Sequence, residues 1–118
     1  MQVTTHPFPG ALVLRITGEL DVRTAGDFRQ RVDDLVTANP QARIILNLSR
    51  LTFLDSTGLG AILGRVRRLQ AAGRPLALVP PVGVARSLLD MVALGRAVSV
   101  FPTERAAVGE GGADDGQG

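Results

Sequence analysis

The feature that most constrains the fold is a predicted strand followed closely by a helix, between residues 44 and 69. Ile44–Leu48 is a mostly apolar run, which is typical of a strand that is covered on both faces. Further on, apolar side chains recur every three or four residues and predict a helix with one buried face: Leu59, Ile62, Leu63, Val66 and Leu69. The polar segment Asp55–Gly60 therefore lies at a helix N-terminus, where backbone N–H groups and the helix dipole favour negative charge.

Ser56 lies at the start of this helix, and its chemistry allows two interpretations. As an N-cap, its hydroxyl would accept a hydrogen bond from an early helical N–H, worth about 1 kcal/mol, although Asp55 or Thr57 could do the same. As a phosphorylation acceptor, it would gain a charge of about −1.5 to −2 where negative charge does not destabilise the fold. The residues alone leave both open, and the second would make Ser56 a reversible switch of a binding surface.

The composition excludes several classes of catalytic chemistry. The 118 residues include no cysteine, so disulfides, zinc–thiolate sites and cysteine nucleophiles are absent. His6, the only histidine, falls in or beside the first predicted strand, and Leu54 replaces the first glycine of the esterase Gly-x-Ser-x-Gly motif. All thirteen basic residues are arginine, so no lysine can complete a P-loop. We therefore predict no catalytic residue, cofactor or metal site, and expect that the chain is not an enzyme.

The charge and hydropathy of the chain limit which kinds of molecule it is expected to bind and where in the cell it is expected. The net charge is only +2, and the nearest approach to a basic cluster is a set of arginines that we interpret as a solvated helix face: Arg65, Arg67, Arg68 and Arg74. Nucleic acid is therefore not an expected partner. No segment resembles a signal peptide or a membrane span, so we expect a cytoplasmic protein without direct membrane insertion.

The remaining pattern predicts an α/β domain with a mixed β-sheet. Strands over residues 2–6 and 11–17, joined by the turn Pro7–Gly10, form an N-terminal antiparallel hairpin. A helix over Ala25–Val36 follows, capped by Asp21 or Thr24 and stopped by Asn39-Pro40. Further strands are predicted at 76–79 and 97–101, and further helices at 82–92 and 103–108. This alternation favours largely parallel pairing after the hairpin, with helices packed on the sheet. We assign residues 1–108 to one domain and 109–118 to a disordered Gly/Asp-rich tail.

Two motifs resemble the anti-sigma-factor antagonists (anti-anti-sigma factors), which consist of a single STAS domain. The first is Leu46–Gly64, with Asp55-Ser56-Thr57-Gly58 at its centre, and the second is the shorter Ile16–Asp21. Their spacing and the order of strands and helices fit a STAS-type domain over about residues 3–105. The final predicted helix is short compared with the usual C-terminal helix of that family.

The resemblance implies a role for Ser56 as a phosphorylation site. In that family, the serine after the aspartate is phosphorylated by an anti-sigma factor with serine kinase activity, and a serine phosphatase reverses the modification. The unphosphorylated protein binds that kinase and releases a sigma factor, so that transcription starts. The free protein is expected to be a monomer. The resemblance also implies partner-binding positions: Asp21, Asp55, Thr57, Gly58, Leu59 and Ile62.

These assignments have structural and functional alternatives. Asp21 is also a candidate helix cap, Gly58 a backbone requirement, and Leu59 and Ile62 core residues, while Thr57 is a second hydroxyl beside the acceptor. A different function on the same fold is an accessory subunit of a membrane (lipid) transport complex, which needs no phosphorylatable serine. A third interpretation is a nucleotide or small-ligand sensor, which requires a pocket that the sequence does not reveal.

Overall fold

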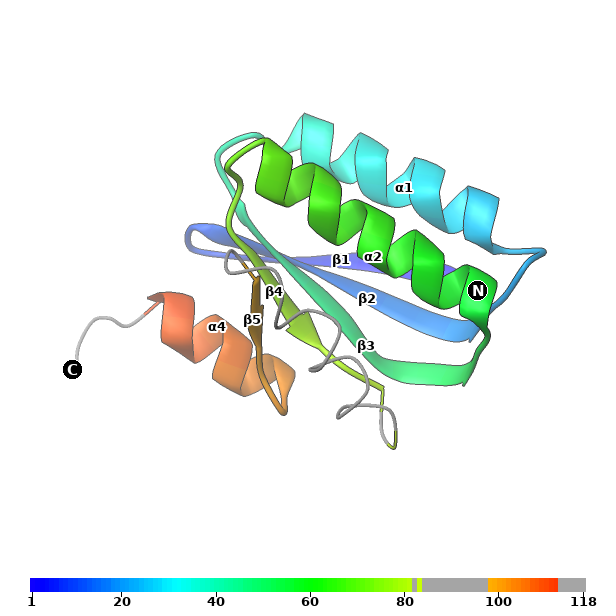
Figure 1. The fold of residues 1–118 in the computed structure, drawn as a ribbon. Coiled ribbons are helices and arrows are strands. Elements are labelled where there is room, and N and C mark those ends of the chain that lie inside the picture. The colour runs from blue at the N-terminus through cyan, green and yellow to red at the C-terminus, as the bar shows by residue number, and fades with distance from the viewer. Residues whose placement is uncertain (82, 84–97, 113–118) are drawn as a thin grey trace.

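The computed structural model describes residues 1–81, 83 and 98–112, and five strands in this part of the chain form one mixed sheet (Figure 1). The first two strands pair antiparallel, and every later neighbour pairs parallel, as the sequence predicts. The spatial order follows the chain order: β1 (Gln2–Phe8), β2 (Ala11–Leu20), β3 (Arg43–Leu54), β4 (Leu76–Val79) and β5 (Val98–Val100).

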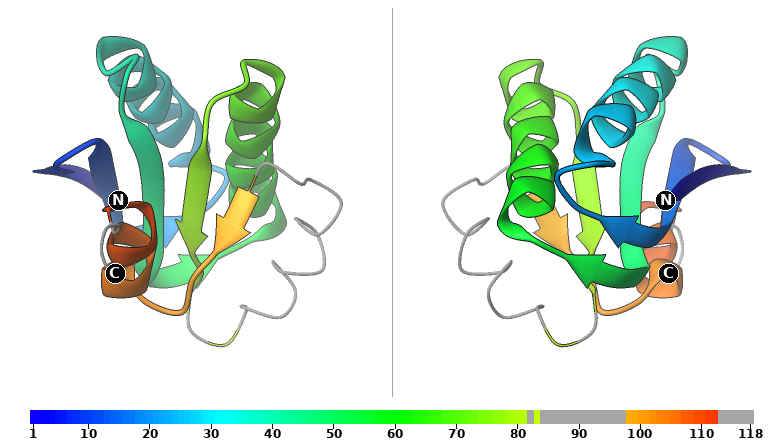
Figure 2. Two further views of the ribbon diagram at one scale, coloured as in Figure 1. Left: turned by 90° about the vertical axis from the view of Figure 1, so that its left-hand side faces the viewer. Right: turned by 90° about the vertical axis from the view of Figure 1, so that its right-hand side faces the viewer.

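Helices cover both faces of this sheet. The helices α1 (Ala25–Ala38) and α2 (Ser56–Ala71) lie side by side on one face, and α4 (Glu104–Gly112) lies on the other (Figures 1 and 2). Along β3, Ile44, Leu46 and Leu48 pack toward α1 and α2, while Ile45 packs in a smaller cluster with Ala107 of α4. Burial on both faces explains why this part of β3 is mostly apolar rather than alternating, with Asn47 as its one polar residue.

The N-terminal hairpin is tighter than predicted. Pro7 and Phe8, which we expected in the turn, continue β1 and pair with Leu12 and Ala11. The turn is reduced to Pro9 and Gly10, and Gly10 has the positive φ of 76° that glycine accommodates without strain. A proline is tolerated within β1 because β1 is an edge strand, where a missing N–H need not break a ladder.

The strands β2 and β3 are longer than predicted at their carboxyl ends. Both were expected to end early, at residues 17 and 48, but they pair on to Leu20 and Leu54 through two irregularities in register. Meanwhile β4 pairs only with the first part of β3, up to Asn47. Beyond that point β3 lacks the apolar run of a strand buried on both faces, which is why the pattern did not predict its continuation.

The C-terminal part agrees with the prediction at β5 and differs at the last helix. The helix expected at 82–92 lies outside the described residues. The strand β5 falls within the predicted 97–101, but α4 continues to Gly112, four residues past the predicted domain end at 108. Its first turns are docked on the sheet, and adding turns to an existing helix costs far less than nucleating one. Residues 109–112 are therefore helical rather than part of a disordered tail.

Candidate functional site

The candidate site lies at one end of the sheet, where the parallel strands β2 and β3 finish and α1 and α2 begin (Figure 1, right; Figure 2, right panel). We call this the carboxyl end. Parallel strands bring their carboxyl ends to the same edge, so the loop after β2 and the N-terminus of α2 become neighbours. Ser56 is the first residue of α2, and both Ser56 and Thr57 are exposed there.

Asp55 is the residue that caps α2 and ties it to the neighbouring loop. Its backbone is extended, and its Oδ1 accepts a hydrogen bond of 2.8 Å from the N–H of Gly58. Its Oδ2 accepts a second one, of 3.2 Å, from the N–H of Val22, while its own N–H donates to Leu20 O at 3.3 Å. Of the three candidate caps, Asp55 therefore takes the role, and the Ser56 hydroxyl makes no hydrogen bond with the described part of the chain.

Asp21 orders the loop between β2 and α1. Its side chain is only 9% exposed, and its Oδ1 accepts hydrogen bonds from the N–H groups of Arg23 (2.9 Å) and Thr24 (3.2 Å). Burial acts to raise the pKa of Asp21, but these bonds and the nearby Arg23 guanidinium together hold that pKa below its usual value. Thr24 occupies the N-cap position of α1 without a capping side-chain bond. Asp21 O also accepts the N–H of Ala25 at 2.8 Å, so the ionised Asp21 caps the turn that leads into α1.

Gly58 is required by close packing between α2 and β2. A Cβ atom at this position would lie 2.4 Å from Leu20 O and 2.9 Å from Leu54 Cδ1, closer than real Cβ contacts. This confirms that Gly58 is a backbone requirement. Ile62 is fully buried in the core, and Leu59 is half-buried. Of the predicted partner-binding residues, the carboxyl end therefore exposes Thr57, Asp55 and Leu59 at least in part, while the Ile62 side chain is inaccessible.

Ser56 is a surface residue, and His6, the only histidine of the chain, lies far from it. His6 pairs with Val13 on β2, seven residues before Leu20, which places it roughly 20 Å along the strand from the carboxyl end. The carboxylate nearest in sequence, Asp55, is held by two backbone N–H groups. In residues 1–81, 83 and 98–112, no group of three histidine or carboxylate side chains is arranged to hold a metal ion.

Two exposed apolar side chains at the carboxyl end do not follow from the sequence pattern. Val22, in the loop after β2, is 70% exposed, and Phe53, near the end of β3, is 50% exposed. Phe53 stands beside Leu54, which packs against the core from the same strand. Side chains alternate between the two faces of a strand, so a core-facing Leu54 implies an outward Phe53. The pattern did not indicate this because the strand was predicted to end at residue 48.

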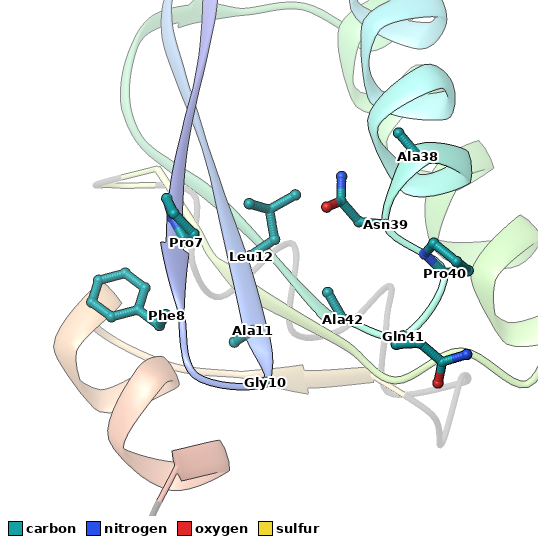
Figure 3. A pocket seen from close by; sticks show the side chains of 10 residues that line it. All are labelled: Pro7, Phe8, Gly10, Ala11, Leu12, Ala38, Asn39, Pro40, Gln41 and Ala42. Atoms are coloured by element: carbon teal, nitrogen blue, oxygen red, sulfur yellow. The ribbon is translucent and has the colours of Figure 1, made fainter.

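A hollow of about 400 Å³ lies at the opposite end of the sheet, beside the start of β2 and the loop before β3 (Figure 3). Its lining includes Phe8, Leu12, Asn39 and Pro40, and none of its lining residues is titratable. It therefore offers apolar contact without acid–base chemistry.

None of the helices that the structure describes is long and apolar enough to cross a membrane.

The comparison with known protein families agrees with this arrangement. The sequence matches the STAS domain over residues 2–107. The chain belongs to the STAS domain family. The resemblance inferred from the two sequence motifs is thereby confirmed.

Individual relatives of this STAS domain narrow the group further. It is 34% identical over 113 residues to an anti-sigma F factor antagonist of Paenibacillus polymyxa, a match that covers 93% of this chain and 94% of the relative. Two solved structures are similar as well. The unphosphorylated anti-sigma factor antagonist SpoIIAA has a TM-score of 0.68 at 26% identity, covering 92% of this chain and 96% of that one. The phosphorylated Bacillus cell fate determinant SpoIIAA has a TM-score of 0.67 at 28% identity, covering 92% and 98%.

Proposed function

We propose that this STAS domain is a cytoplasmic bacterial anti-sigma-factor antagonist and not an enzyme. In this proposal it binds an anti-sigma factor that has serine kinase activity, which releases a sigma factor. Phosphorylation of Ser56 ends the binding, and a serine phosphatase restores it. The names of the relatives support the antagonist function, and the fact that SpoIIAA has been solved in phosphorylated form supports the modification.

The observation that carries the proposal is that Asp55, and not Ser56, caps α2. Asp55 supplies the cap that α2 needs, so the exposed Ser56 hydroxyl is left without a structural role in the described part of the chain. Within residues 1–81, 83 and 98–112, the backbone N–H groups of Ser56 and Thr57 also have no acceptor, as is usual in the first turn of a helix. A phosphate on Ser56 would meet these donors and the positive end of the helix dipole.

The modification would act on the contact surface. It would add a charge of about −1.5 to −2 beside the carboxylate of Asp55, in the middle of the partner-binding positions that we retain: Asp55, Thr57 and Leu59. A partner that packs closely on Ser56 would have to remove water from that dianion, which is strongly unfavourable without compensating cations. Docking would therefore be lost while the domain stays folded.

The test compares Ser56→Ala and Ser56→Asp in binding to the anti-sigma factors of the same organism. We expect Ser56→Ala to bind like the natural chain and Ser56→Asp to bind at least about tenfold more weakly, with Thr57→Ala as the matched control. Equal affinities of the Ser56→Ala and Ser56→Asp variants would refute the switch. Mass spectrometry after incubation with ATP and the kinase should place phosphate on Ser56 and not on Thr57. Co-purification with a transport ATPase, without phosphorylation, would instead support the transport-complex alternative.

A further inference from the structure

Arg23 places a cation in the loop that contacts the start of α2. The N–H of Val22, the residue before it, donates to Asp55 Oδ2 at 3.2 Å, and Ser56 follows Asp55 directly (Figure 2, right panel). The N–H of Asp55 also donates to Leu20 O at 3.3 Å, so the loop is held against α2 at two points. The backbone of Arg23 is therefore fixed one residue away from a contact with the residue before Ser56.

The side chain of Arg23 is long enough to reach a phosphate on Ser56. Arg23 and Ser56 each lie one residue, about 3.8 Å, beyond the pair that is joined by the Val22–Asp55 hydrogen bond. An extended arginine side chain reaches about 6–7 Å from its Cα, and the oxygens of a serine phosphate reach about 4 Å. Because Arg23 follows the end of β2, its side chain lies at the edge of the sheet and is not confined to one face.

The present partners of the Arg23 guanidinium do not depend on it. The side chain is 79% exposed, and its Nη2 lies 3.3 Å from Asp21 Oδ2 and 3.9 Å from Glu19 Oε1. Asp21 Oδ1 accepts the backbone N–H groups of Arg23 and Thr24, and both bonds remain if the guanidinium moves away. Exposed ion pairs contribute little to stability. Arg23 can therefore exchange Asp21 for a stronger acceptor without disturbing the loop.

A phosphate on Ser56 would be such an acceptor. It carries a charge of about −1.5 to −2 and three acceptor oxygens, whereas the carboxylate of Asp21 carries one charge and is shared with two backbone N–H groups. The planar guanidinium of arginine also matches phosphate oxygens in a two-point contact. Within residues 19–24 and 54–60, the other charged residues are the carboxylates Glu19, Asp21 and Asp55, so Arg23 is the one cation of these two segments.

We propose that phosphorylation of Ser56 draws the Arg23 guanidinium away from Asp21 and onto the phosphate, so that Arg23 is an internal clamp of the modified state. This inference rests on the proposed function and adds a residue to the regulation of the same site. One guanidinium offsets only part of the phosphate charge, so the repulsion that prevents docking remains. The clamp also moves an arginine toward Ser56, which changes the docking surface at two residues instead of one.

The experiment measures the pKa of the phosphate by ³¹P NMR in protein that carries phosphoserine at position 56, incorporated during synthesis so that no kinase is needed. A nearby cation favours the dianion, so we expect Arg23→Gln to raise this pKa by about 0.3–0.7. Arg23→Lys keeps the charge without the planar fork and should fall between Arg23→Gln and the natural side chain. The difference should shrink in about 0.5 M NaCl, because the contact is exposed.

Arg31→Gln is the matched control, because it removes the same charge from another exposed arginine. Arg31 pairs with Asp27 at 3.0 Å and lines a hollow with residues 3–5 of β1, so it lies beside β1 rather than α2. We expect this variant to leave the phosphate pKa within about 0.1 of the value with Arg31 in place.

Three outcomes overturn the clamp. The first is a phosphate pKa in Arg23→Gln within about 0.1 of that in the natural chain, and the second is an equal rise in Arg31→Gln, which would reflect net charge alone. The third is a marked loss of stability on urea unfolding of unphosphorylated Arg23→Gln, because the loop would then depend on the pair with Asp21. If instead the anti-sigma factor binds the phosphoserine protein as tightly as the unmodified one, the switch fails, while the pKa still decides the clamp.

Discussion

At the scale of single residues, Asp55 and Gly58 determine how α2 begins and so where Ser56 points. The carboxylate of Asp55 satisfies the N–H of Gly58 from within the helix and the N–H of Val22 from outside it. Gly58 lets the first turn approach the backbone of β2 at Leu20. The position of Ser56 is thus determined by Asp55 before it and Gly58 two residues after it, and its own hydroxyl makes no hydrogen bond with the described part of the chain.

Replacing Gly58 by alanine tests this close approach. The added Cβ would meet Leu20 O at 2.4 Å, so either α2 or the end of β2 must move, and we expect a loss of about 1–3 kcal/mol in the free energy of unfolding. Gly60 lies in the same helix and is the matched control, because a Cβ added there would meet no atom outside the helix backbone within 4 Å. Gly60→Ala should stabilise the protein by up to about 1 kcal/mol through helix propensity. Urea unfolding measures both, and equal stabilities of the two variants would contradict the packing argument.

The Asp55 cap gives a second prediction at this scale. Asp55→Ala should cost about 1–2 kcal/mol, since it leaves the Gly58 and Val22 N–H groups without their acceptor. Asp55→Asn keeps a side-chain oxygen for Gly58 and should recover much of that loss. Amide hydrogen exchange should show faster exchange at Gly58 and Val22 in Asp55→Ala. Unchanged exchange at both would mean that Asp55 does not hold the loop.

At the scale of elements, the sequence predicts the parts that bury apolar side chains with a clear period. The hairpin, α1, the start of β3, α2 and β4 all follow from such patterns. The continuation of β3 from Ser49 to Leu54 does not, because among the described strands only β2 pairs with it there and its side chains are largely polar or exposed. For the same reason, the sequence pattern did not predict an exposed Phe53. Likewise, no local pattern indicates that Asp55 rather than Ser56 is the cap, since Asp55 is also held by the N–H of Val22, 33 residues away in sequence.

The docking of α4 on the sheet shows a polar contact that no local pattern reveals. Glu104, in the first turn of α4, accepts hydrogen bonds from Arg15 Nε (2.9 Å) and Nη2 (2.8 Å) on β2 and from Asn47 Nδ2 (2.8 Å) on β3. The bonds from Arg15 act most strongly, and they outweigh partial burial, so the pKa of Glu104 falls to about 2. One carboxylate thereby joins two strands to the last helix.

This pairing predicts how stability depends on pH. The folded pKa of Glu104 lies below its ordinary 4.5, so its contribution, on the order of 2 kcal/mol, is present above about pH 4.5 and is lost as the pH falls toward about 2. Glu104→Gln should therefore lower the free energy of unfolding at pH 7, and its deficit relative to the natural chain should shrink with acidification. Asp27→Asn, which removes an exposed pair with Arg31, is the control and should have little effect. A deficit that is constant from pH 7 to pH 3 would contradict the ionised role of Glu104.

At the scale of the whole molecule, the two ends of the sheet carry different properties. The carboxyl end carries Ser56 and the exposed pair Val22 and Phe53. The opposite end holds a hollow without titratable groups (Figure 3). Ser56 is not part of the core between α1, α2 and the sheet. A charge added to Ser56 therefore changes one surface of the molecule and leaves the buried contacts as they are.

This separation predicts that phosphorylation changes binding and leaves stability nearly unchanged. The net charge of the whole chain would fall from +2 to about zero, yet the free energy of unfolding should stay within about 0.5 kcal/mol, because repulsion from Asp55 and attraction to the start of α2 oppose each other. Urea unfolding of the phosphorylated protein and of Ser56→Asp measures this, beside binding to the anti-sigma factor. A loss of more than about 1 kcal/mol would mean that the modification loosens the carboxyl end itself. The lost affinity would then come from a disordered docking surface, and a variant that restores stability, such as Gly60→Ala, should restore part of the binding.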